Sequence, residues 1–154
     1  MSASTDRVQA ALLAAGCRSE VVFLERPGRT ALEAASAIGI ELGQIVKSLV
    51  FNLSGEAVLL LVAGDRRVDT GRLEEVTGRR PAAMATPEQV KAATGFAIGG
   101  VAPIGHPKTL ETLVDESLCR FEVVWAAAGA PEAVFEIPLG SLIEMTGGTP
   151  ASFT

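Results

Sequence analysis

The chain has 154 residues, 48% of them hydrophobic and 20% charged, which is typical of one globular domain and excludes a disordered chain. Its formal net charge is −5, whereas proteins that wrap long nucleic acids are normally basic. Residues 1–110 carry 12 Lys/Arg against 11 Asp/Glu, and residues 111–154 carry one Arg against seven acids. We therefore expect no DNA binding, and only local contact with a nucleic acid, away from the C-terminal segment.

Neither a membrane span nor a metal site is expected from the sequence. The longest apolar run, residues 57–64, has the length of a strand. The first ten residues do not resemble a secretory signal. Cys17 and Cys119 stand far apart and form no CxxC motif. We expect free, buried thiols, a cytoplasmic location, and no metal or other cofactor.

The first element in chain order is a helix, followed by a short strand. The helix is expected over residues 4–15, with Ser4 as its cap and Gly16 as its end. The run EVVFLE predicts a strand over residues 20–25.

A second helix and a hairpin follow. Thr30 and Glu33 have the spacing of a capping box, which predicts a helix that ends at Gly39. Two apolar runs then flank Ser54 and Gly55, the signal of a β-hairpin.

The second half continues with short elements. A capping box of Thr86 and Gln89, with Pro87 at the first helical position, predicts one of its helices. The remaining expectations are helices over 69–78 and 138–148 and strands over 110–115, 121–129 and 133–137. Because strands often follow one another without helices, we expect a single α+β domain over residues 1–154. It would have a twisted, mixed and largely antiparallel sheet surrounded by short helices.

The loop GGVAPIGHP, residues 99–107, concentrates three glycines and two prolines. Such a stretch is either a tight connection or a rigid cradle that presents backbone N–H groups to a ligand. His106, the one histidine, lies in this loop, where a surface role is the plain alternative to a functional one. The common motifs for a nucleophile, a metal or a phosphate loop do not occur.

Lys47 lies among apolar residues in QIVKSLVF. Strand alternation places it on the face opposite Val46 and Ser48. Its ammonium either extends from the core border into water or is held over an anionic or carbonyl group of a ligand.

The lysine of QIVKSLVF and the GGVAPIG loop, in this order, resemble the YbaK/ProX family of aminoacyl-tRNA deacylases. These are relatives of the editing domain of bacterial prolyl-tRNA synthetases. The resemblance extends from about residue 20 to residue 146. It implies a mixed sheet with helices around it and hydrolysis of the ester that joins a wrong amino acid to the tRNA 3′ end. It also implies a reaction without a metal or protein nucleophile, in which a hydroxyl of the terminal adenosine helps to position water.

The resemblance also implies roles for individual residues. Lys47 corresponds to the family lysine, and Gly99 to Pro103 corresponds to its Gly-x-x-x-Pro loop. We assign Lys47 and Gly99 as catalytic, with Lys47 holding a phosphate or the ester. The expected substrate-binding residues are Thr30, Ser48, Gly100, Val101, Ala102, Pro103 and His106.

The sequence departs from the cysteine-removing members at three positions. Ser48 replaces a threonine, Ala102 replaces a serine, and Val134 replaces an acid. These departures argue against cysteine as the preferred substrate, and the stretches GHP and WAAAGAP resemble subgroups that remove alanine, serine, threonine or similar amino acids. We expect a small substrate amino acid of the Ala, Ser, Thr or Cys class. The expected partners are the aminoacyl-tRNA 3′ end and prolyl-tRNA synthetase or another synthetase. One alternative is an inactive module that binds an aminoacyl group or nucleotide for a synthetase. A weaker one is an unrelated small-molecule hydrolase, against which the missing nucleophile–base pair argues.

Overall fold

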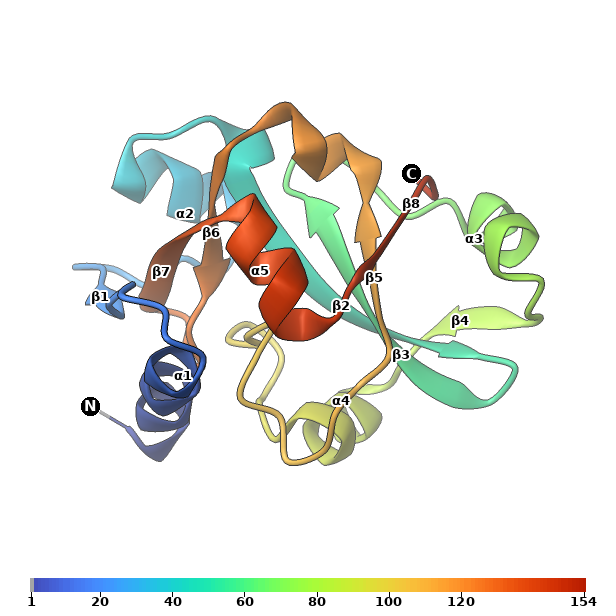
Figure 1. Cartoon of the computed structure of the whole chain (residues 1–154), viewed down its shortest axis with the longest axis horizontal. Coiled ribbons are helices and arrows are strands. Elements are labelled where there is room, and N and C mark those ends of the chain that lie inside the picture. Colours follow the sequence, from blue (N-terminus) through green and yellow to red (C-terminus); the bar gives the residue numbers. More distant parts are fainter. Residues whose placement is uncertain (1) are drawn as a thin grey trace.

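Eight strands form one mixed β-sheet, which confirms the predicted α+β class (Figure 1). The structure is a computed structural model and describes residues 2–154. The strand order is β1-β7-β6-β2-β3-β5-β8, and β4 also pairs with β2. The strands are β1 (Val22–Phe23), β2 (Ile45–Leu53), β3 (Glu56–Ala63), β4 (Ala82–Met84), β5 (Thr112–Asp115), β6 (Val123–Ala127), β7 (Ala133–Pro138) and β8 (Thr149–Ala151).

Antiparallel pairing dominates the sheet, as predicted. The pairs β1–β7, β2–β3, β2–β4 and β6–β7 are antiparallel, whereas β2–β6, β3–β5 and β5–β8 are parallel. The turn between β2 and β3 has positive φ at both Ser54 (52°) and Gly55 (86°), as type I′ hairpin turns require. The hairpin predicted from this dipeptide is therefore confirmed.

Five α-helices and two short 3₁₀ helices surround the sheet in the described residues. The predicted caps Thr30 and Thr86 each accept a hydrogen bond from the backbone N–H three residues later. The helices are α1 (Ala3–Ala14), α2 (Ala31–Ile38), α3 (Thr70–Thr77), α4 (Pro87–Thr94) and α5 (Leu139–Thr146), with η1 (Leu42–Gln44) and η2 (Glu116–Arg120).

One predicted helix start and one predicted capping box need correction. Helix α1 is capped by Ser2 rather than Ser4, because Ser2 and Thr5 close a capping box that starts the helix earlier. Before α2, the Glu33 carboxylate accepts the N–H of Arg29 rather than that of Thr30, so this capping box is incomplete.

The strand predicted over residues 20–25 is reduced to Val22–Phe23. It lies at the edge of the sheet, pairs only with β7, and leaves both of its side chains exposed. An edge position explains the short pairing, since one neighbouring strand alone holds it.

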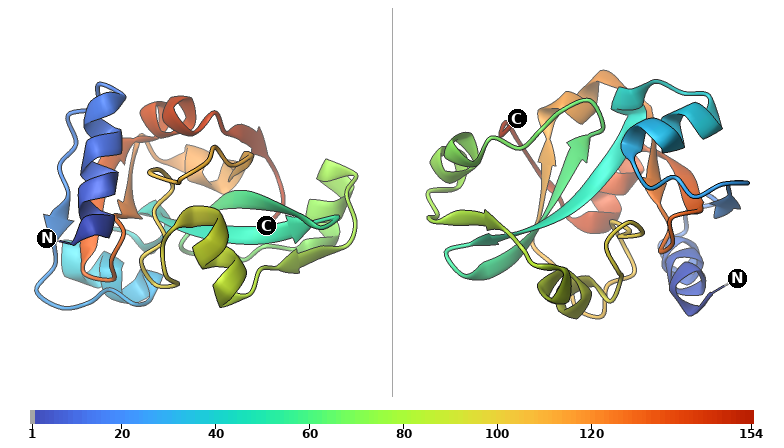
Figure 2. Two further views of the ribbon diagram at one scale, coloured as in Figure 1. Left: turned by 90° about the horizontal axis from the view of Figure 1, so that it is seen from below. Right: turned by 180° about the vertical axis from the view of Figure 1, so that it is seen from behind.

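Apolar side chains cover both faces of the sheet. On one face, Val46 and Val50 of β2 belong to a cluster that includes residues of α1, α5 and the glycine-rich loop. On the other face, Phe51 packs in a cluster with Leu73 of α3 and Phe153. Helices α1 and α3 lie at opposite ends of the molecule (Figures 1 and 2). Within residues 2–154, no helix has the length and apolar character that crossing a membrane requires.

Candidate active site

The candidate active site is a pocket at a gap in the sheet. One edge of β2 pairs with β3 along almost its whole length. The other edge pairs with β6 at Ile45 and Val46 and with β4 at residues 51–53, so residues 47–50 have no neighbouring strand there. A pocket of about 380 Å³ opens at this gap, a volume within the range of small-molecule sites.

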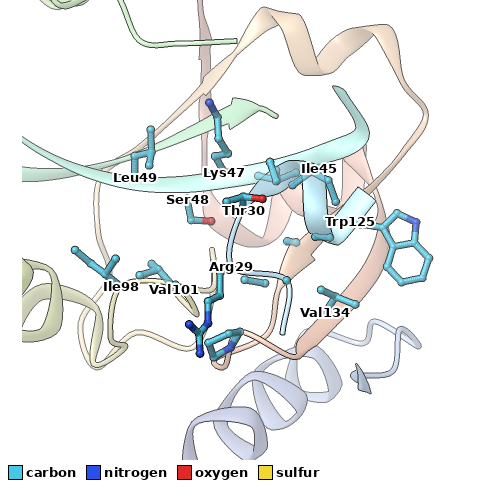
Figure 3. Close-up of a pocket in the computed structure, with 18 of the residues that line it drawn as sticks. Arg29, Thr30, Ile45, Lys47, Ser48, Leu49, Ile98, Val101, Trp125 and Val134 are labelled. Atoms are coloured by element: carbon cyan, nitrogen blue, oxygen red, sulfur yellow. The ribbon is translucent and has the colours of Figure 1, made fainter. Parts of the chain in front are cut away.

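Residues from both faces of β2 line this pocket because the strand edge is free. Figure 3 shows Lys47 and Leu49 on one side of β2 and Ser48 on the other, the side of Ile98 and Val101. All five residues belong to the pocket lining. The predicted alternation of Lys47 and Ser48 is therefore confirmed, and the gap lets the pocket reach both of them.

The Lys47 ammonium donates a hydrogen bond to the backbone carbonyl of Arg66. Its pKa is lowered, first by burial and then by the nearby charge of Arg67, while Asp65 acts in the opposite direction. Asp65 belongs to the loop after β3 that also contains Arg66 and Arg67. Its carboxylate forms a bidentate ion pair with Arg120, at 2.9 and 2.7 Å, which anchors this loop. The ammonium thus lies at the core border, as predicted, and is held by a fixed backbone oxygen.

The Ser48 hydroxyl is buried and has no hydrogen-bond partner in the part of the chain that the structure describes. It points from β2 toward the pocket (Figure 3). Leaving a buried hydroxyl unpaired costs about 1–3 kcal/mol. A group that bears this cost inside a pocket is suited to bind a polar ligand.

Gly99 and Gly100 of the glycine-rich loop occupy different environments. Gly99 lines the pocket with φ at 99°, a left-handed conformation that other residues adopt only under strain. Gly100 does not line the pocket, because it packs on Ala130, and an added Cβ would meet the Ala130 Cα at 2.7 Å. The Gly100 N–H is bonded to the Ala97 carbonyl at 3.1 Å. We expected Gly100 to bind the substrate, but it packs closely against the backbone of Ala130 instead.

The backbone N–H groups of Gly99 and Val101 make no hydrogen bond with any group in residues 2–154. Both residues line the pocket, and Val101 is buried. Two free donors at one wall of a pocket can bind a carbonyl oxygen or an anion.

Ala102, Pro103 and His106 lie outside this pocket. His106 Nε2 is 2.8 Å from the carbonyl oxygen of Ala102, and its ring packs edge-on against Phe96. Its pKa is lowered, mainly by burial, with the Ala102 carbonyl acting in the opposite direction and the charge of Arg7 lowering it further. Pro103 and His106 line a separate, smaller cavity. These residues shape the loop from behind rather than face the pocket.

Comparison with known proteins places the chain in a family. The sequence pattern of the family described as "Aminoacyl-tRNA editing domain" matches residues 25–145. The chain belongs to this family. The resemblance to the YbaK/ProX proteins is thereby confirmed.

Three relatives show how widely this editing domain occurs. The uncharacterized protein YwhH of Bacillus subtilis is 36% identical over 129 residues, 83% of this chain and 82% of that protein. EbsC of Enterococcus faecalis, provisionally named a Cys-tRNA(Pro)/Cys-tRNA(Cys) deacylase, is 30% identical over 122 residues, 73% of this chain and 74% of that protein. The proline–tRNA ligase of Nitratidesulfovibrio vulgaris is 40% identical over 93 residues, which cover 60% of this chain and 16% of the ligase.

Solved structures have the same fold. A protein described provisionally as a trans-editing enzyme for prolyl tRNA synthetase has a TM-score of 0.94 and 46% identity, with 100% of this chain and 98% of that chain covered. The hypothetical protein APE2540 has a TM-score of 0.88 and 28% identity, with 96% and 98% covered. The predicted YbaK/ProX-like architecture is therefore confirmed.

Residues 29 and 30 bring polar groups to the mouth of the editing-domain pocket. Thr30 lines the pocket while its hydroxyl oxygen caps α2. Arg29, which our sequence reasoning missed, also lines it, and its guanidinium makes no ion pair or hydrogen bond within the described chain. An unpaired guanidinium at a pocket mouth is suited to a phosphate.

The other walls of the pocket are mostly apolar and were also missed. They come from segments far apart in sequence. Only Val134 was singled out in the sequence, as a departure from the cysteine-removing members. The principal members are Met84, Ala85, Val90, Ile98, Trp125, Ala126, Pro131, Ala133 and Val134. No Asp, Glu, His or Cys lines the described pocket.

Neither cysteine belongs to the site. Both thiols are free, as predicted, but Cys119 is exposed and Cys17 only half-buried, which corrects the expectation that both are buried. Cys119 lies on η2, where Ser117 and Leu118 are the buried residues and Cys119 faces solvent. Within residues 2–154, no three His, Cys, Asp or Glu side chains gather as metal ligands would.

Proposed function

We propose that this editing domain hydrolyses the ester bond between a tRNA 3′ end and a small amino acid of the Ala, Ser, Thr or Cys class. The observation that carries the proposal is that Lys47, Ser48 and Gly99 line one pocket with mostly apolar walls. The provisional names of EbsC and of the 46% identical structure support the same reaction class.

The free N–H groups of Gly99 and Val101 would bind the ester carbonyl oxygen. When water adds to the carbonyl carbon, negative charge develops on this oxygen, and fixed donors stabilise it. The intermediate then expels the ribose oxygen, which takes up a proton and restores the free tRNA end. An aminoacyl ester is activated enough for positioning and charge stabilisation to carry most of the catalysis.

Lys47 would bind a phosphate or the ester end of the substrate. Lys47 lines the pocket, and its flexible side chain can exchange the Arg66 carbonyl for a substrate oxygen. The lowered pKa of Lys47 means that its amine gives up a proton more readily than an exposed lysine does. Both properties fit a residue that acts at the reacting end of the pocket.

The walls of the pocket would select the amino acid by size. Val101 and Val134 bring neither charge nor hydrogen-bonding side chains to it. An apolar wall discriminates by about 1–3 kcal/mol per methylene and rejects an added hydroxyl poorly. We therefore expect overlapping activity on alanyl-, seryl- and threonyl-tRNA rather than one sharply selected substrate.

The tRNA end would be held by a few contacts at the mouth. Arg29 offers a charge for one phosphate, and helix α2 with Thr30 at its start borders the opening. Recognition of the rest of the tRNA would fall to a synthetase partner, in keeping with the seven acids against one Arg in residues 111–154.

The test is a deacylation panel with alanyl-, seryl-, threonyl-, cysteinyl- and phenylalanyl-tRNA, each at two salt concentrations. We expect hydrolysis of the small esters, little of the phenylalanyl ester, and a weak dependence on salt. Rapid phenylalanyl release or strict cysteine preference would contradict the pocket assignment. Binding without any hydrolysis would favour the inactive module that serves a synthetase.

A further inference from the structure

Ser48 turns its backbone polar groups into the gap of the sheet. The Ile45 carbonyl accepts the N–H of Gly64 in β3, so residues 45, 47 and 49 direct their backbone groups toward β3. Strand alternation then directs those of 46, 48 and 50 toward the other edge. There, Val46 pairs with β6, and the Val50 carbonyl accepts the N–H of Ala85. Among residues 2–154, Ser48 is the member of this set whose backbone groups find no hydrogen-bond partner at this edge.

Three polar groups of Ser48 are thus unpaired at one place. Its Oγ is buried without a hydrogen-bond partner among residues 2–154, and its N–H and C=O face the same gap. Two of the three, the carbonyl and the hydroxyl oxygen, are acceptors. Unpaired acceptors inside a mostly apolar pocket are suited to accept hydrogen bonds from a ligand.

The opposite wall has the complementary chemistry. The N–H groups of Gly99 and Val101 are donors, so they suit the carbonyl oxygen of an ester. In an α-amino ester, the ammonium group that supplies N–H donors is attached to the carbon next to that carbonyl. Acceptors at Ser48 and donors on the glycine-rich loop in one pocket therefore match an α-amino ester better than a simple ester.

We propose that Ser48 forms the subsite for the α-ammonium group of the substrate, with its carbonyl and Oγ as acceptors. This inference rests on the proposed deacylase function. In the absence of an acidic residue in the described pocket lining, the ammonium is bound by these neutral oxygens. The Lys47 side chain leaves β2 on the side opposite to Ser48, so its charge does not lie beside the proposed ammonium subsite. The pocket thereby selects esters with a free α-amine.

The test compares alanyl-tRNA with lactyl-tRNA, in which a hydroxyl replaces the ammonium at nearly the same size. Each enzymatic rate is divided by the spontaneous hydrolysis rate of the same ester, which removes the difference in intrinsic reactivity. We expect kcat/KM for the lactyl ester, so normalised, to be at least about tenfold lower. Equal acceleration of both esters would overturn the Ser48 subsite while leaving the deacylase function intact. Acceleration of neither would overturn the deacylase function itself.

Variants of Ser48 test whether this residue causes the preference for alanyl-tRNA over lactyl-tRNA. Ser48→Ala removes the hydroxyl and should narrow the alanyl-to-lactyl ratio, whereas Ser48→Thr keeps the hydroxyl and should preserve it. Ser141→Ala is the matched control, because Ser141 is a half-buried serine of α5 outside the pocket. An unchanged ratio in folded Ser48→Ala would overturn the role of Oγ. If this variant does not fold, the two esters with the natural chain still decide the inference.

Discussion

Lys47 and Ser48 are adjacent on β2 and point to opposite sides of the strand, yet both line one pocket (Figure 3). In a continuous sheet these two side chains would be separated by the sheet itself. They share a pocket here because the pairing of β2 with β6 stops after Val46 and its pairing with β4 starts only at Phe51. The interruption of the sheet is thus what creates the candidate active site.

Gly99→Ala should lower the deacylation rate by at least about tenfold, because one misdirected oxyanion donor is worth on the order of 3 kcal/mol. The strain comes from φ at 99°, since the space around Gly99 is open apart from Pro131 Cγ at 3.8 Å. Single-turnover rates measure the loss of activity, and melting temperatures measure the loss of stability that the backbone strain causes.

The matched control for this substitution is Gly16→Ala. Gly16 also has a positive φ, 74°, with no atom near an added Cβ, and it lies outside the pocket. Both variants should lose about 1 kcal/mol of stability, but only Gly99→Ala should lose activity. Equal activity of the two variants would mean that the loop is only a connection.

Local signals accounted for what could be predicted of this fold. The Ser54–Gly55 hairpin and the caps at Thr30 and Thr86 depend on neighbouring residues, so the sequence revealed them. The short strands β4 and β8 were missed, since they exist only through pairing with β2 and β5.

The candidate site could be predicted only in part, for the same reason. The alternation of Lys47 and Ser48 is local, but the free strand edge beside them depends on where distant strands end. Arg29 and Trp125 reach the pocket through tertiary packing and have no motif of their own. The packing of Gly100 on Ala130 was equally invisible, because a glycine alone does not reveal which neighbour approaches it.

Arg29→Gln should weaken binding of the charged tRNA and reduce the slope of log Kd against log salt by about one phosphate contact. Its guanidinium is free at the pocket mouth. Arg26→Gln is the control, since Arg26 is exposed on the same segment and does not line the pocket. Identical salt slopes for the two variants would contradict a phosphate site at Arg29.

Asp115→Asn should destabilise the chain by about 2 kcal/mol at neutral pH, because a buried carboxylate loses its charged hydrogen bonds. Burial alone would raise the pKa of Asp115, but bonds from the Phe153 N–H, Ser117 and Thr154 lower it overall. A carboxyl whose pKa is lower in the folded state stabilises above its unfolded pKa of about 3.9 and loses this contribution as the pH falls.

Melting temperatures measured from pH 7 to pH 2 test this dependence. The difference between the natural chain and Asp115→Asn should shrink as the pH falls below about 4. Glu116→Gln, at the exposed neighbouring position, should show no such change. A difference that stays constant over the range would show that the Asp115 charge contributes nothing.

Chelators and the double substitution Cys17→Ser with Cys119→Ser should leave deacylation unchanged. Neither thiol lines the pocket, and no metal-ligand cluster exists among the described side chains. The measurement is the alanyl-tRNA hydrolysis rate with and without EDTA. A loss of activity that added zinc restores would require a metal in the mechanism.

The single-turnover rate of alanyl-tRNA hydrolysis by Lys47→Ala, measured beside the natural chain and Lys91→Ala, tests the proposed site most directly. Lys91 is an exposed lysine of α4 outside the pocket, so its variant controls for the loss of one positive charge. We predict that the natural chain and Lys91→Ala accelerate hydrolysis equally, while Lys47→Ala falls to the spontaneous rate and keeps its melting temperature within a few degrees. Full activity of a folded Lys47→Ala would contradict the assignment of this pocket as the active site.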